Sequence, residues 1–356
     1  MIRLVQLQGP YARRLALVEE PRLVLLEGCS SVYELVQACL AQQGSVSKVI
    51  ANLLGRERID YDAVYVGASE WKILPSVDHA EEPARCLVSG TGLTHMASAR
   101  NRQAMHGKPE DLSDSMRMYR WGLEGGKPAA CEIGVAPEWF YKGNGASLRG
   151  HNAPLTIPEF AADGGEEPEI AGVYVIDAEG VPLRIGFTQG NEFSDHELER
   201  KNYLYLAASK LRSCSIGPEL VIGGEFESVP GTVSIEREGR PLWSGSIRTG
   251  EQAMSHTLAN LEHHHFKFEA HRRPGDVHVH FFGADAFSFG DGIRLEDGDF
   301  MQVHFQGFGR PLRNPLHREH AQERVVSVRP LEAGDGDELV SDNQESGLGL
   351  SGRCKE

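Results

Sequence analysis

Residues 165–218 decide the fold, and they open with Gly-Glu-Glu-Pro-Glu-Ile (165–170). Residues 171–188 form two apolar runs around a polar turn that contains glycine, and Gly-Asn-Glu-Phe-Ser-Asp-His (190–196) follows. This pattern predicts a β-hairpin with carboxylates at the open ends of both strands. Oxygen ligands that strand pairing brings together suit Mg²⁺, with Mn²⁺ as the other candidate.

Three glutamates are the candidate metal ligands. Glu167 and Glu169 are two residues apart, so on a strand both side chains point to the same face. Glu192 follows the returning strand, where the hairpin sets it beside that pair. Asn191, Ser194, Asp195 and His196 can supply hydrogen bonds near the ligands. Glu-x-Glu is also common in solvated acidic turns, and on spacing alone this alternative stays open.

Three further residues are candidates for acid–base chemistry. Glu138 lies in an aromatic segment, and burial against aromatic rings raises the pKa of a carboxyl group. Lys142 ends the same segment, and Lys210 follows Leu-Ala-Ala-Ser (206–209). A lysine beside a metal site can neutralise substrate charge or act as a base. The alternatives are an exposed strand glutamate and two ordinary surface lysines.

The bulk composition excludes several classes of protein. The chain has 356 residues and a net charge of −15, which disfavours nucleic-acid and anionic-membrane partners because both are themselves negatively charged. No apolar run is long enough to span a bilayer, and the first residues do not read as a signal peptide. Six scattered cysteines without a CxxC pair indicate reduced thiols. We therefore expect a cytoplasmic protein.

The predicted fold class is α+β and β-rich, in agreement with the high glycine content. Residues 1–80 predict a small α/β domain, and residues 85–330 the main domain. Within the main domain, residues 96–105, 114–125 and 250–268 predict helices, and 220–237 a pair of strands. The remainder, 331–356, is rich in Gly, Ser, Asp and Glu and predicts a disordered tail.

The histidine-rich segments do not predict a metal site. His263, His264 and His265 are adjacent, so on a helix they face different directions. His278 and His280 share a strand face, but no His-Glu-x-x-His frame exists, and we favour a structural role. The glycine-rich pieces match neither a phosphate loop nor a dinucleotide fingerprint, and no Gly-x-Ser-x-Gly elbow occurs. Hydride transfer, kinase and serine-hydrolase chemistry therefore have no support.

Together these pieces resemble the fumarylacetoacetate hydrolase superfamily over roughly residues 85–316. The resemblance implies a mixed β-roll after a small N-terminal domain, and a divalent cation on Glu167, Glu169 and Glu192. The segments that carry it are Glu-Pro-Glu (167–169), Asn-Glu-Phe-Ser (191–194), Ser-Lys (209–210), Gly-Pro (217–218), Leu-Glu-Asp-Gly-Asp-Phe (295–300) and Gly-Phe-Gly-Arg-Pro-Leu-Arg-Asn-Pro (307–315).

Within this superfamily the chain looks most similar to the 2-keto-3-deoxy-pentonate dehydratases, on Pro-Glu-Trp-Phe-Tyr-Lys (137–142) and Asn-Tyr-Leu-Tyr-Leu-Ala-Ala-Ser-Lys (202–210), besides the two acidic segments. The resemblance implies Mg²⁺-dependent dehydration of a 2-keto-3-deoxy-pentonate to 2,5-dioxopentanoate, by a homodimer or larger homo-oligomer. It implies Glu138 and Lys210 as acid and base, in an order that stays open. Substrate contacts are expected from Lys142, Thr94, Arg100 or Arg102, Asn191 and Ser194.

Two departures from the family pattern leave alternatives open. The third ligand is usually aspartate, and here it is Glu192. The family's Gly-Thr-Pro is replaced by Gly-Ala-Asp-Ala-Phe-Ser (283–288). C–C bond hydrolysis of a 2,4-diketo acid, decarboxylation, and a non-catalytic binding protein of the same fold are the alternatives. His95 does not match the hydrolases' histidine cleanly, which favours the dehydratase.

Overall fold

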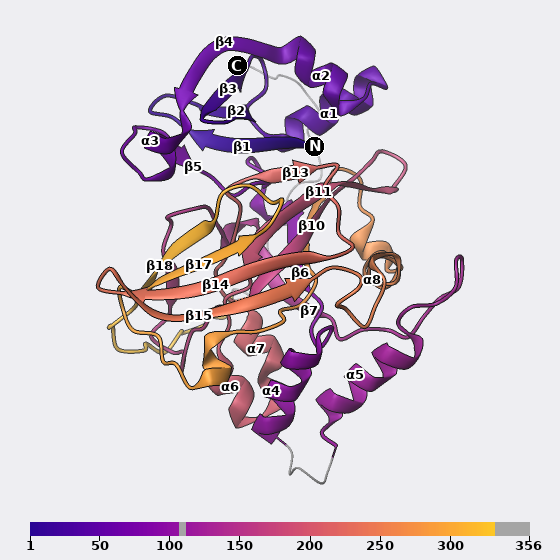
Figure 1. Ribbon diagram of the computed structural model, residues 1–356, viewed down its shortest axis with the longest axis vertical. Helices are drawn as coiled ribbons and strands as arrows, with labels where there is room; N and C mark the ends of the chain where they lie inside the picture. The colour runs from indigo at the N-terminus through magenta and orange to yellow at the C-terminus, as the bar shows by residue number, and fades with distance from the viewer. Residues whose placement is uncertain (107–111, 332–356) are drawn as a thin grey trace, which may run out of the picture. The chain divides into compact units, whose positions relative to one another are not determined.

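The computed structural model describes residues 1–106 and 112–331. Residues Met1–His320 form one compact unit, shown in Figure 1. Residues 321–331 contain neither helix nor strand, and the predicted tail lies, apart from Leu331, outside the described residues. No helix in the described part of the chain is long and apolar enough to cross a bilayer.

The N-terminal segment folds as a curled antiparallel sheet that packs against helices. Ser31 and Ser45 cap the first two helices by accepting hydrogen bonds from backbone N–H groups of the first turn. The elements are β1 (Ile2–Gln8), β2 (Arg13–Glu19), β3 (Arg22–Leu26), α1 (Val32–Gln42), α2 (Val46–Leu53), β4 (Leu54–Asp60), α3 (Tyr61–Tyr65) and β5 (Lys72–Ile73). The predicted α/β character of this segment agrees with these elements, while a domain boundary near residue 80 stays a prediction.

The first sheet has thirteen strands and includes the predicted hairpin. Most of the sheet follows the order β4-β3-β2-β1-β13-β11-β10-β16-β6-β7. The β1–β13 pairing joins the N-terminal strands to the rest, and β16 pairs in parallel with β6. The strands beyond the N-terminal segment are β6 (Cys86–Gly90), β7 (Phe140–Asn144), β8 (Leu148–Arg149), β10 (Pro168–Ile176), β11 (Pro182–Asn191), β12 (Cys214–Ile216), β13 (Leu220–Ile222) and β16 (Val277–Phe281).

A second, five-stranded sheet has the order β15-β14-β17-β18-β9. Its strands are β9 (Leu155–Ile157), β14 (Val229–Arg237), β15 (Arg240–Thr249), β17 (Phe300–Phe305) and β18 (Leu312–Arg318). The predicted strand pair over 220–237 is instead divided between β13 in the first sheet and β14 in the second. Strand β15 was not predicted, because it lies at the sheet edge and exposes most of its residues.

Five helices accompany the main sheets: α4 (Met96–His106), α5 (Asp114–Gly125), α6 (His196–Lys201), α7 (Leu206–Lys210) and α8 (Leu258–Phe266). The predictions for α4 and α5 agree with the structure to within one residue. The helix predicted over 250–268 begins later, because Thr257 caps it at Leu258 and the residues before it form turns.

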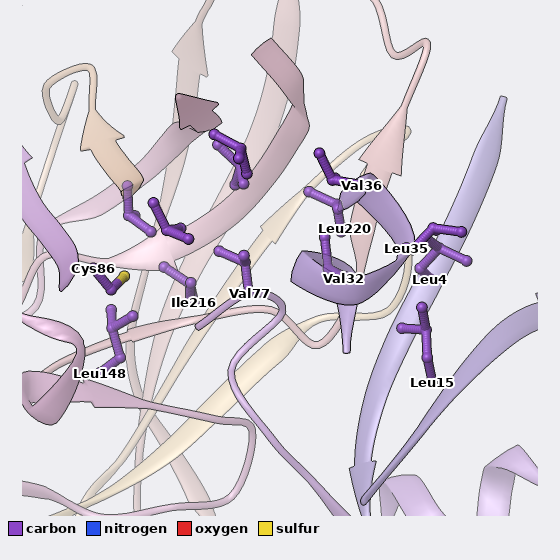
Figure 2. Packing of buried hydrophobic residues seen from close by; sticks show 14 of the residues in the cluster. Leu4, Leu15, Val32, Leu35, Val36, Val77, Cys86, Leu148, Ile216 and Leu220 are labelled. Atoms are coloured by element: carbon purple, nitrogen blue, oxygen red, sulfur yellow. The ribbon is translucent and has the colours of Figure 1, made fainter. Parts of the chain in front are cut away.

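The largest apolar core connects the N-terminal helices with the centre of the first sheet. Val32 and Leu35 on α1, which are labelled in Figure 2, belong to the same buried cluster as Val173 and Val279 on the central strands. All nine residues of β10 are buried, since β11 and β16 pair along its two edges and side chains cover both of its faces. The hairpin is thus held inside the protein, and any charged group at its end must find a partner there.

Candidate metal centre and active site

The β10–β11 hairpin brings three glutamates to one point. Glu169 pairs with Gly190 across the hairpin, and the backbone N–H of Glu192 donates to the carbonyl of Glu167 at 2.8 Å. One carboxylate oxygen from each of Glu167, Glu169 and Glu192 lies within 4.8 Å of the other two, and all three residues are buried. Pro168 is the first residue of β10, a position that tolerates its missing N–H. The carboxylate of Glu192 thus reaches the carboxylates of Glu167 and Glu169, although the side chain of glutamate is longer than that of aspartate.

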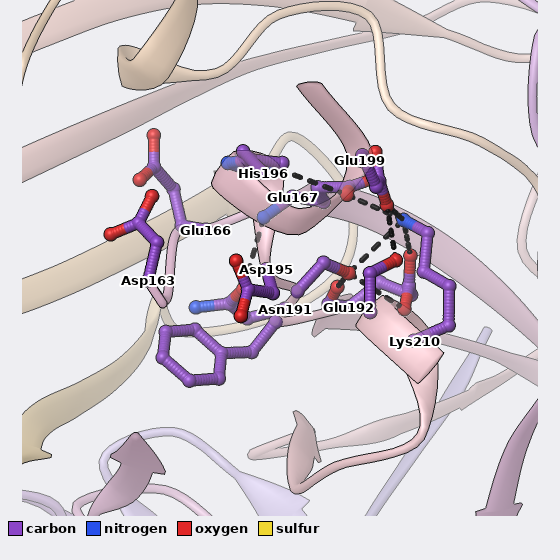
Figure 3. Close-up of polar contacts among 12 residues, drawn as sticks. Asp163, Glu166, Glu167, Asn191, Glu192, Asp195, His196, Glu199 and Lys210 are labelled. Carbon is purple, nitrogen blue, oxygen red and sulfur yellow. Dashed lines mark hydrogen bonds and ion pairs between the residues drawn. The ribbon is translucent and has the colours of Figure 1, made fainter. Parts of the chain in front are cut away.

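Two buried lysines pair with these carboxylates, as Figure 3 shows for Lys210. The Lys210 Nζ lies 2.5 Å from Glu167 Oε1 and 2.6 Å from Glu192 Oε2. From β7, Lys142 Nζ lies 2.7 Å from Glu192 Oε1 and also donates to the carbonyl of Phe193. Neither lysine is an ordinary surface residue, since their side chains are at most 1% exposed.

Among the described residues, no cationic side chain is in direct contact with the Glu169 carboxylate. Glu169 accepts a hydrogen bond from the N–H of Gly283 at 2.7 Å. Burial, followed by the charges of Glu192 and Glu167, raises the pKa of Glu169 well above its ordinary value. Burial also acts to raise the pKa of Glu167, but Lys210 and His196 outweigh it and hold that pKa well below the usual range. Glu169 thus lacks the counter-charge that its neighbour has.

Polar groups from the hairpin and the helix after it orient the glutamates. Asn191 Oδ1 accepts from the backbone N–H of Glu167 at 3.1 Å, and His196 Nε2 donates to Glu167 Oε1 at 3.0 Å. Ser194 Oγ donates to the carbonyl of Glu192 at 2.8 Å and accepts from Lys210 at 3.0 Å. Asn191 and Ser194, both expected in the site, are therefore bonded to the ligands themselves.

Glu138 lies just before β7 and close to the loop after β6. A Cβ atom at Gly92 would lie 1.8 Å from Glu138 Oε2, so only glycine leaves room for this carboxyl group. Desolvation raises the pKa of Glu138 to about 7, although the positive charges of Arg102 and Lys210 oppose the shift. A carboxyl group with this pKa can release or accept a proton near neutral pH.

The predicted substrate-binding residues on and before α4 divide into three cases. Arg102 is 4% exposed, and its charge acts on Glu138 and on the glutamate cluster. Arg100 is exposed and is not brought to the cluster by this structure. Thr94 is buried, but its hydroxyl donates to the carbonyl of Phe282 at 2.7 Å and is bonded to His95 Nδ1 at 2.9 Å.

Glu199, near the cluster, had no predicted role in the site, whereas His196 was predicted to supply a hydrogen bond near the ligands and is bonded to Glu167. Glu199 on α6 is fully buried and pairs with Arg102, and Ser209 Oγ donates to it at 2.6 Å. His196 at the start of α6 is likewise buried. The spacing of Asp195 and Glu199 places both on one side of the helix, but this signal is weak because short helices often carry such acidic residues.

The segment Gly-Ala-Asp-Ala-Phe-Ser (283–288) also contacts acidic residues. Besides the Gly283 N–H on Glu169, the backbone N–H and the hydroxyl of Ser288 donate to Glu166 at 2.6 and 2.8 Å. Phe287 stacks on the His196 ring with 4.6 Å between centroids. This segment thus supports the glutamate end of the hairpin.

The residues present fit a divalent cation. The donors are carboxylate oxygens, which Mg²⁺ and Mn²⁺ prefer. Among the described residues, five carboxyl groups interact here with four basic side chains, so the acidic groups outnumber the basic ones: the carboxyl groups are Glu138, Glu167, Glu169, Glu192 and Glu199, and the basic groups are Arg102, Lys142, Lys210 and His196. The fold and site thus define a class, a sheet-rich protein with a buried candidate centre for a divalent cation.

Comparison with known proteins gives this class particular relatives. The chain is 34% identical over 122 residues to a 2-dehydro-3-deoxy-D-arabinonate dehydratase of Saccharolobus solfataricus, a match that covers 33% of this chain and 40% of that protein. It is 28% identical over 140 residues to a probable 2-keto-3-deoxyxylonate dehydratase of Haloferax volcanii, covering 36% and 46%. The chain thus matches less than half the length of each relative. No model of a known protein family matches it.

Solved structures match over a longer range. A 2-keto-3-deoxyarabinonate dehydratase superposes with a TM-score of 0.67 at 20% identity, over 90% of this chain and 100% of that one. The 2-keto-3-deoxy-D-arabinonate dehydratase complexed with magnesium and 2,5-dioxopentanoate gives the same TM-score and coverage at 19% identity. At this identity the structures show the fold. The predicted fold class and the predicted similarity to these dehydratases are therefore confirmed.

Proposed function

We propose that this protein is a metal-dependent hydro-lyase that converts a 2-keto-3-deoxy-pentonate into 2,5-dioxopentanoate and water. The observation that carries this proposal is the buried glutamate triad, which adjoins two lysines and a carboxyl group with a pKa of about 7. The names of the two curated relatives, and of the structure complexed with magnesium and 2,5-dioxopentanoate, support the choice of substrate.

In this proposal Glu167, Glu169 and Glu192 hold Mg²⁺, or Mn²⁺ in its place. The bound cation supplies Lewis acidity to the oxygens of the 2-keto acid and neutralises the negative charge that develops on them. Lys142 keeps the Glu192 side chain in place through its contact at 2.7 Å, and His196 does the same for Glu167. The chain's own groups thus fix the ligand geometry before substrate arrives.

The remaining groups handle protons. In the reaction the C3–H bond and the C4–O bond break, a C3–C4 double bond forms, and the C4 hydroxyl leaves as water after it takes up a proton. The resulting 5-hydroxy enone then moves a proton from C5 to C3, and the enol so formed becomes the aldehyde. Glu138 and Lys210 are the proposed acid and base, and each is expected to contribute about 10²–10⁴-fold to the rate.

The support for the substrate contacts proposed from the sequence differs from residue to residue. Arg102 is buried beside Glu138 and remains a proposed substrate contact. The hydroxyl of Thr94 is already bonded to the protein, so we propose that this residue shapes the loop before α4. Arg100 is exposed and carries no argument for a contact.

The decisive test is a screen of 2-keto-3-deoxy sugar acids with added Mg²⁺, in which 2,5-dioxopentanoate is detected by coupling to a semialdehyde dehydrogenase. We expect turnover that chelator abolishes and Mg²⁺ restores. Pyruvate or carbon dioxide from 2,4-diketo acids, without semialdehyde from any sugar acid, would show C–C hydrolysis or decarboxylation instead. Stoichiometric ligand binding with no product would show a binding protein of this fold.

We further propose a homodimer or larger homo-oligomer located in the cytoplasm. Five described cysteines, Cys29, Cys39, Cys86, Cys131 and Cys214, are free, which agrees with a reducing compartment. Light scattering coupled to size-exclusion chromatography measures the oligomer directly, and a monomeric mass for the active enzyme would contradict this part of the proposal.

A further inference from the structure

A buried ion pair between α4 and α6 lies next to the proposed active site. Arg102 Nη2 is 2.5 Å from Glu199 Oε2, and the two side chains are 4% and 0% exposed. The Arg102 guanidinium also lies over the ring of Tyr203, 5.3 Å from its centroid. Pairs of this kind are costly to bury, and the cost is offset only when the remaining donors and acceptors are satisfied.

This pair is incompletely satisfied. Among the described residues, Nε and Nη1 of Arg102 and Oε2 of Glu199 have no hydrogen-bond partner. The close Nη2–Oε2 contact is thus an ion pair without the alignment of a hydrogen bond. A buried donor or acceptor left without a partner is destabilising, so the native protein is expected to find a group for these atoms.

The pair is connected to the reacting groups. Glu199 Oε1 lies 3.6 Å from Lys210 Nζ, and the same ammonium contacts Glu167 and Glu192. The positive charge of Arg102 lowers the pKa of Glu138, and it does so more than the charge of Lys210. One side chain, Lys210, therefore separates the pair from the metal-binding carboxylates.

We propose that Arg102 and Glu199 recognise the C5 hydroxyl of the substrate, an inference that rests on the proposed dehydratase function. A hydroxyl group both donates and accepts, which matches free N–H groups on Arg102 and a free oxygen on Glu199. Lys210 contacts both the glutamate triad and Glu199, so a substrate with its keto-acid end at the triad and with C3 and C4 at the proton-transfer groups would direct C5 toward the pair.

The charges of Arg102 and Glu199 determine which chemical group at C5 of the substrate this pair accepts. Glu199 already neutralises Arg102, so a second carboxylate on the substrate would meet no free positive charge here. A methyl group would leave Nε and Nη1 of Arg102 and Oε2 of Glu199 without a hydrogen-bond partner. The pair therefore selects monocarboxylic 2-keto-3-deoxy acids with a free C5 hydroxyl over both dicarboxylic acids and 5-deoxy acids.

Two substrates that differ only at C5 test this inference: 4,5-dihydroxy-2-oxopentanoate and its 5-deoxy analogue, 4-hydroxy-2-oxopentanoate. Product formation from both can be followed by NMR with Mg²⁺ present. Sites built to hydrogen-bond a hydroxyl reject the analogue that lacks it by about 10⁴–10⁵-fold at best. We expect a ratio of kcat/KM values of at least about 100 in the wild-type enzyme. A ratio near one would overturn the inference.

Variants of Arg102 and Glu199 then test whether this pair is the cause of the ratio of kcat/KM values. Arg102→Lys keeps the charge but removes the free guanidinium donors, and Glu199→Gln keeps the shape but removes the charge. We expect each to lower the ratio at least about 10-fold, mainly through loss of kcat/KM for the dihydroxy acid. Arg117→Lys on α5, where the arginine is 56% exposed, is the matched control and should keep the wild-type ratio. Equal losses for both substrates would mean a structural role.

Failure of the proposed function gives a different result. A wild-type enzyme that turns over neither acid would refute the dehydratase proposal. Equilibrium binding of the two acids to the Mg²⁺-loaded protein would still test the pair. Tighter binding of the dihydroxy acid, lost in Arg102→Lys, would support hydroxyl recognition, and equal binding would overturn it.

Discussion

Two buried polar clusters lie on adjoining strands of one sheet, and they differ in charge. The first is the glutamate–lysine cluster at the end of β10 and β11. The second contains His278 and His280 on β16, which pairs with β10, and His265 on α8. Both are rich in residues that can bind metal ions. Only the glutamate cluster brings three such residues within bonding reach of one ion in the described part of the chain.

The histidine cluster is held together by hydrogen bonds between neutral groups, although His278 Nε2 has no partner among the described residues. Trp139 Nε1 donates to His265 Nδ1 at 3.1 Å, and His265 Nε2 is bonded to His278 Nδ1 at 3.0 Å. The His280 ring is bonded to Ser89 Oγ at 2.8 Å, and on its other side to a threonine hydroxyl. Burial lowers the pKa values of His278 and His280 to about 3, so both rings are neutral at pH 7.

The difference between the two clusters shows that the cost of burying polar groups depends on whether they carry charge. Neutral imidazoles can be buried cheaply, because each hydrogen bond with a neighbour replaces one with water. Crowded carboxylates cannot, because their repulsion grows as water leaves. Glu169 is buried, and no cationic side chain among the described residues contacts it, so a bound cation would supply the positive charge that its surroundings lack. The buried histidine rings are neutral and need no such cation.

The largest expected effect comes from the glutamate cluster. Glu167→Gln removes one anionic metal ligand, and we expect turnover to fall about 1000-fold, equivalent to about 4 kcal/mol of transition-state stabilisation. Titration calorimetry with Mg²⁺ should show weaker binding in parallel. Glu179→Gln in the exposed β10–β11 turn is the control. Wild-type activity of Glu167→Gln in chelator-treated buffer would disprove the metal assignment.

The next effect concerns Glu138. With a pKa of about 7, this residue should give the wild-type profile of kcat/KM against pH a limb near pH 7. Activity that falls as pH rises through 7 identifies Glu138 as the acid, and activity that falls as pH drops identifies it as the base. Glu138→Gln should lower kcat about 10²–10⁴-fold and remove the limb. A limb that persists in this variant belongs to another group.

A smaller effect is expected from His196, which orients Glu167 without contacting substrate in our proposal. His196→Gln should weaken Mg²⁺ affinity about 10–100-fold. Its kcat at saturating Mg²⁺ should stay close to that of the wild type, because the ligand itself remains. If kcat falls while Mg²⁺ affinity is unchanged, His196 takes part in the reaction and not in positioning.

The smallest effect belongs to the histidine cluster. His278 has a folded-state pKa of about 3, so below pH 6.5 the unfolded chain takes up a proton that the folded protein refuses. Stability is therefore lost as pH falls, by about 2 kcal/mol for this ring between pH 7 and pH 5. His278→Gln should reduce the pH dependence of urea unfolding by that amount, and His317→Gln at the exposed His317 should not. An unchanged dependence in His278→Gln would mean that this ring is charged in the folded protein.

The sequence predicted the parts of this protein that depend on local pattern. The alternating and apolar runs of the hairpin, the capped helices and the Glu167–Glu169 spacing follow from neighbours along the chain. Glu192 and Lys210 were candidates from their local context, the resemblance to several short segments supported their roles, and the structure brings them together. Strand β15 and the true start of α8 were missed, because an exposed edge and a series of turns carry little periodic signal.

What the sequence by itself determined is the set of carboxylates and lysines and the hairpin that carries the glutamates. Only the tertiary structure decided which charged groups share one buried volume. Arg102 and Glu199 are far apart along the chain, and their 2.5 Å contact exists because α4 and α6 pack together. Electrostatic interactions depend on distance and on the exclusion of water, and both are set by packing between elements that local sequence does not specify.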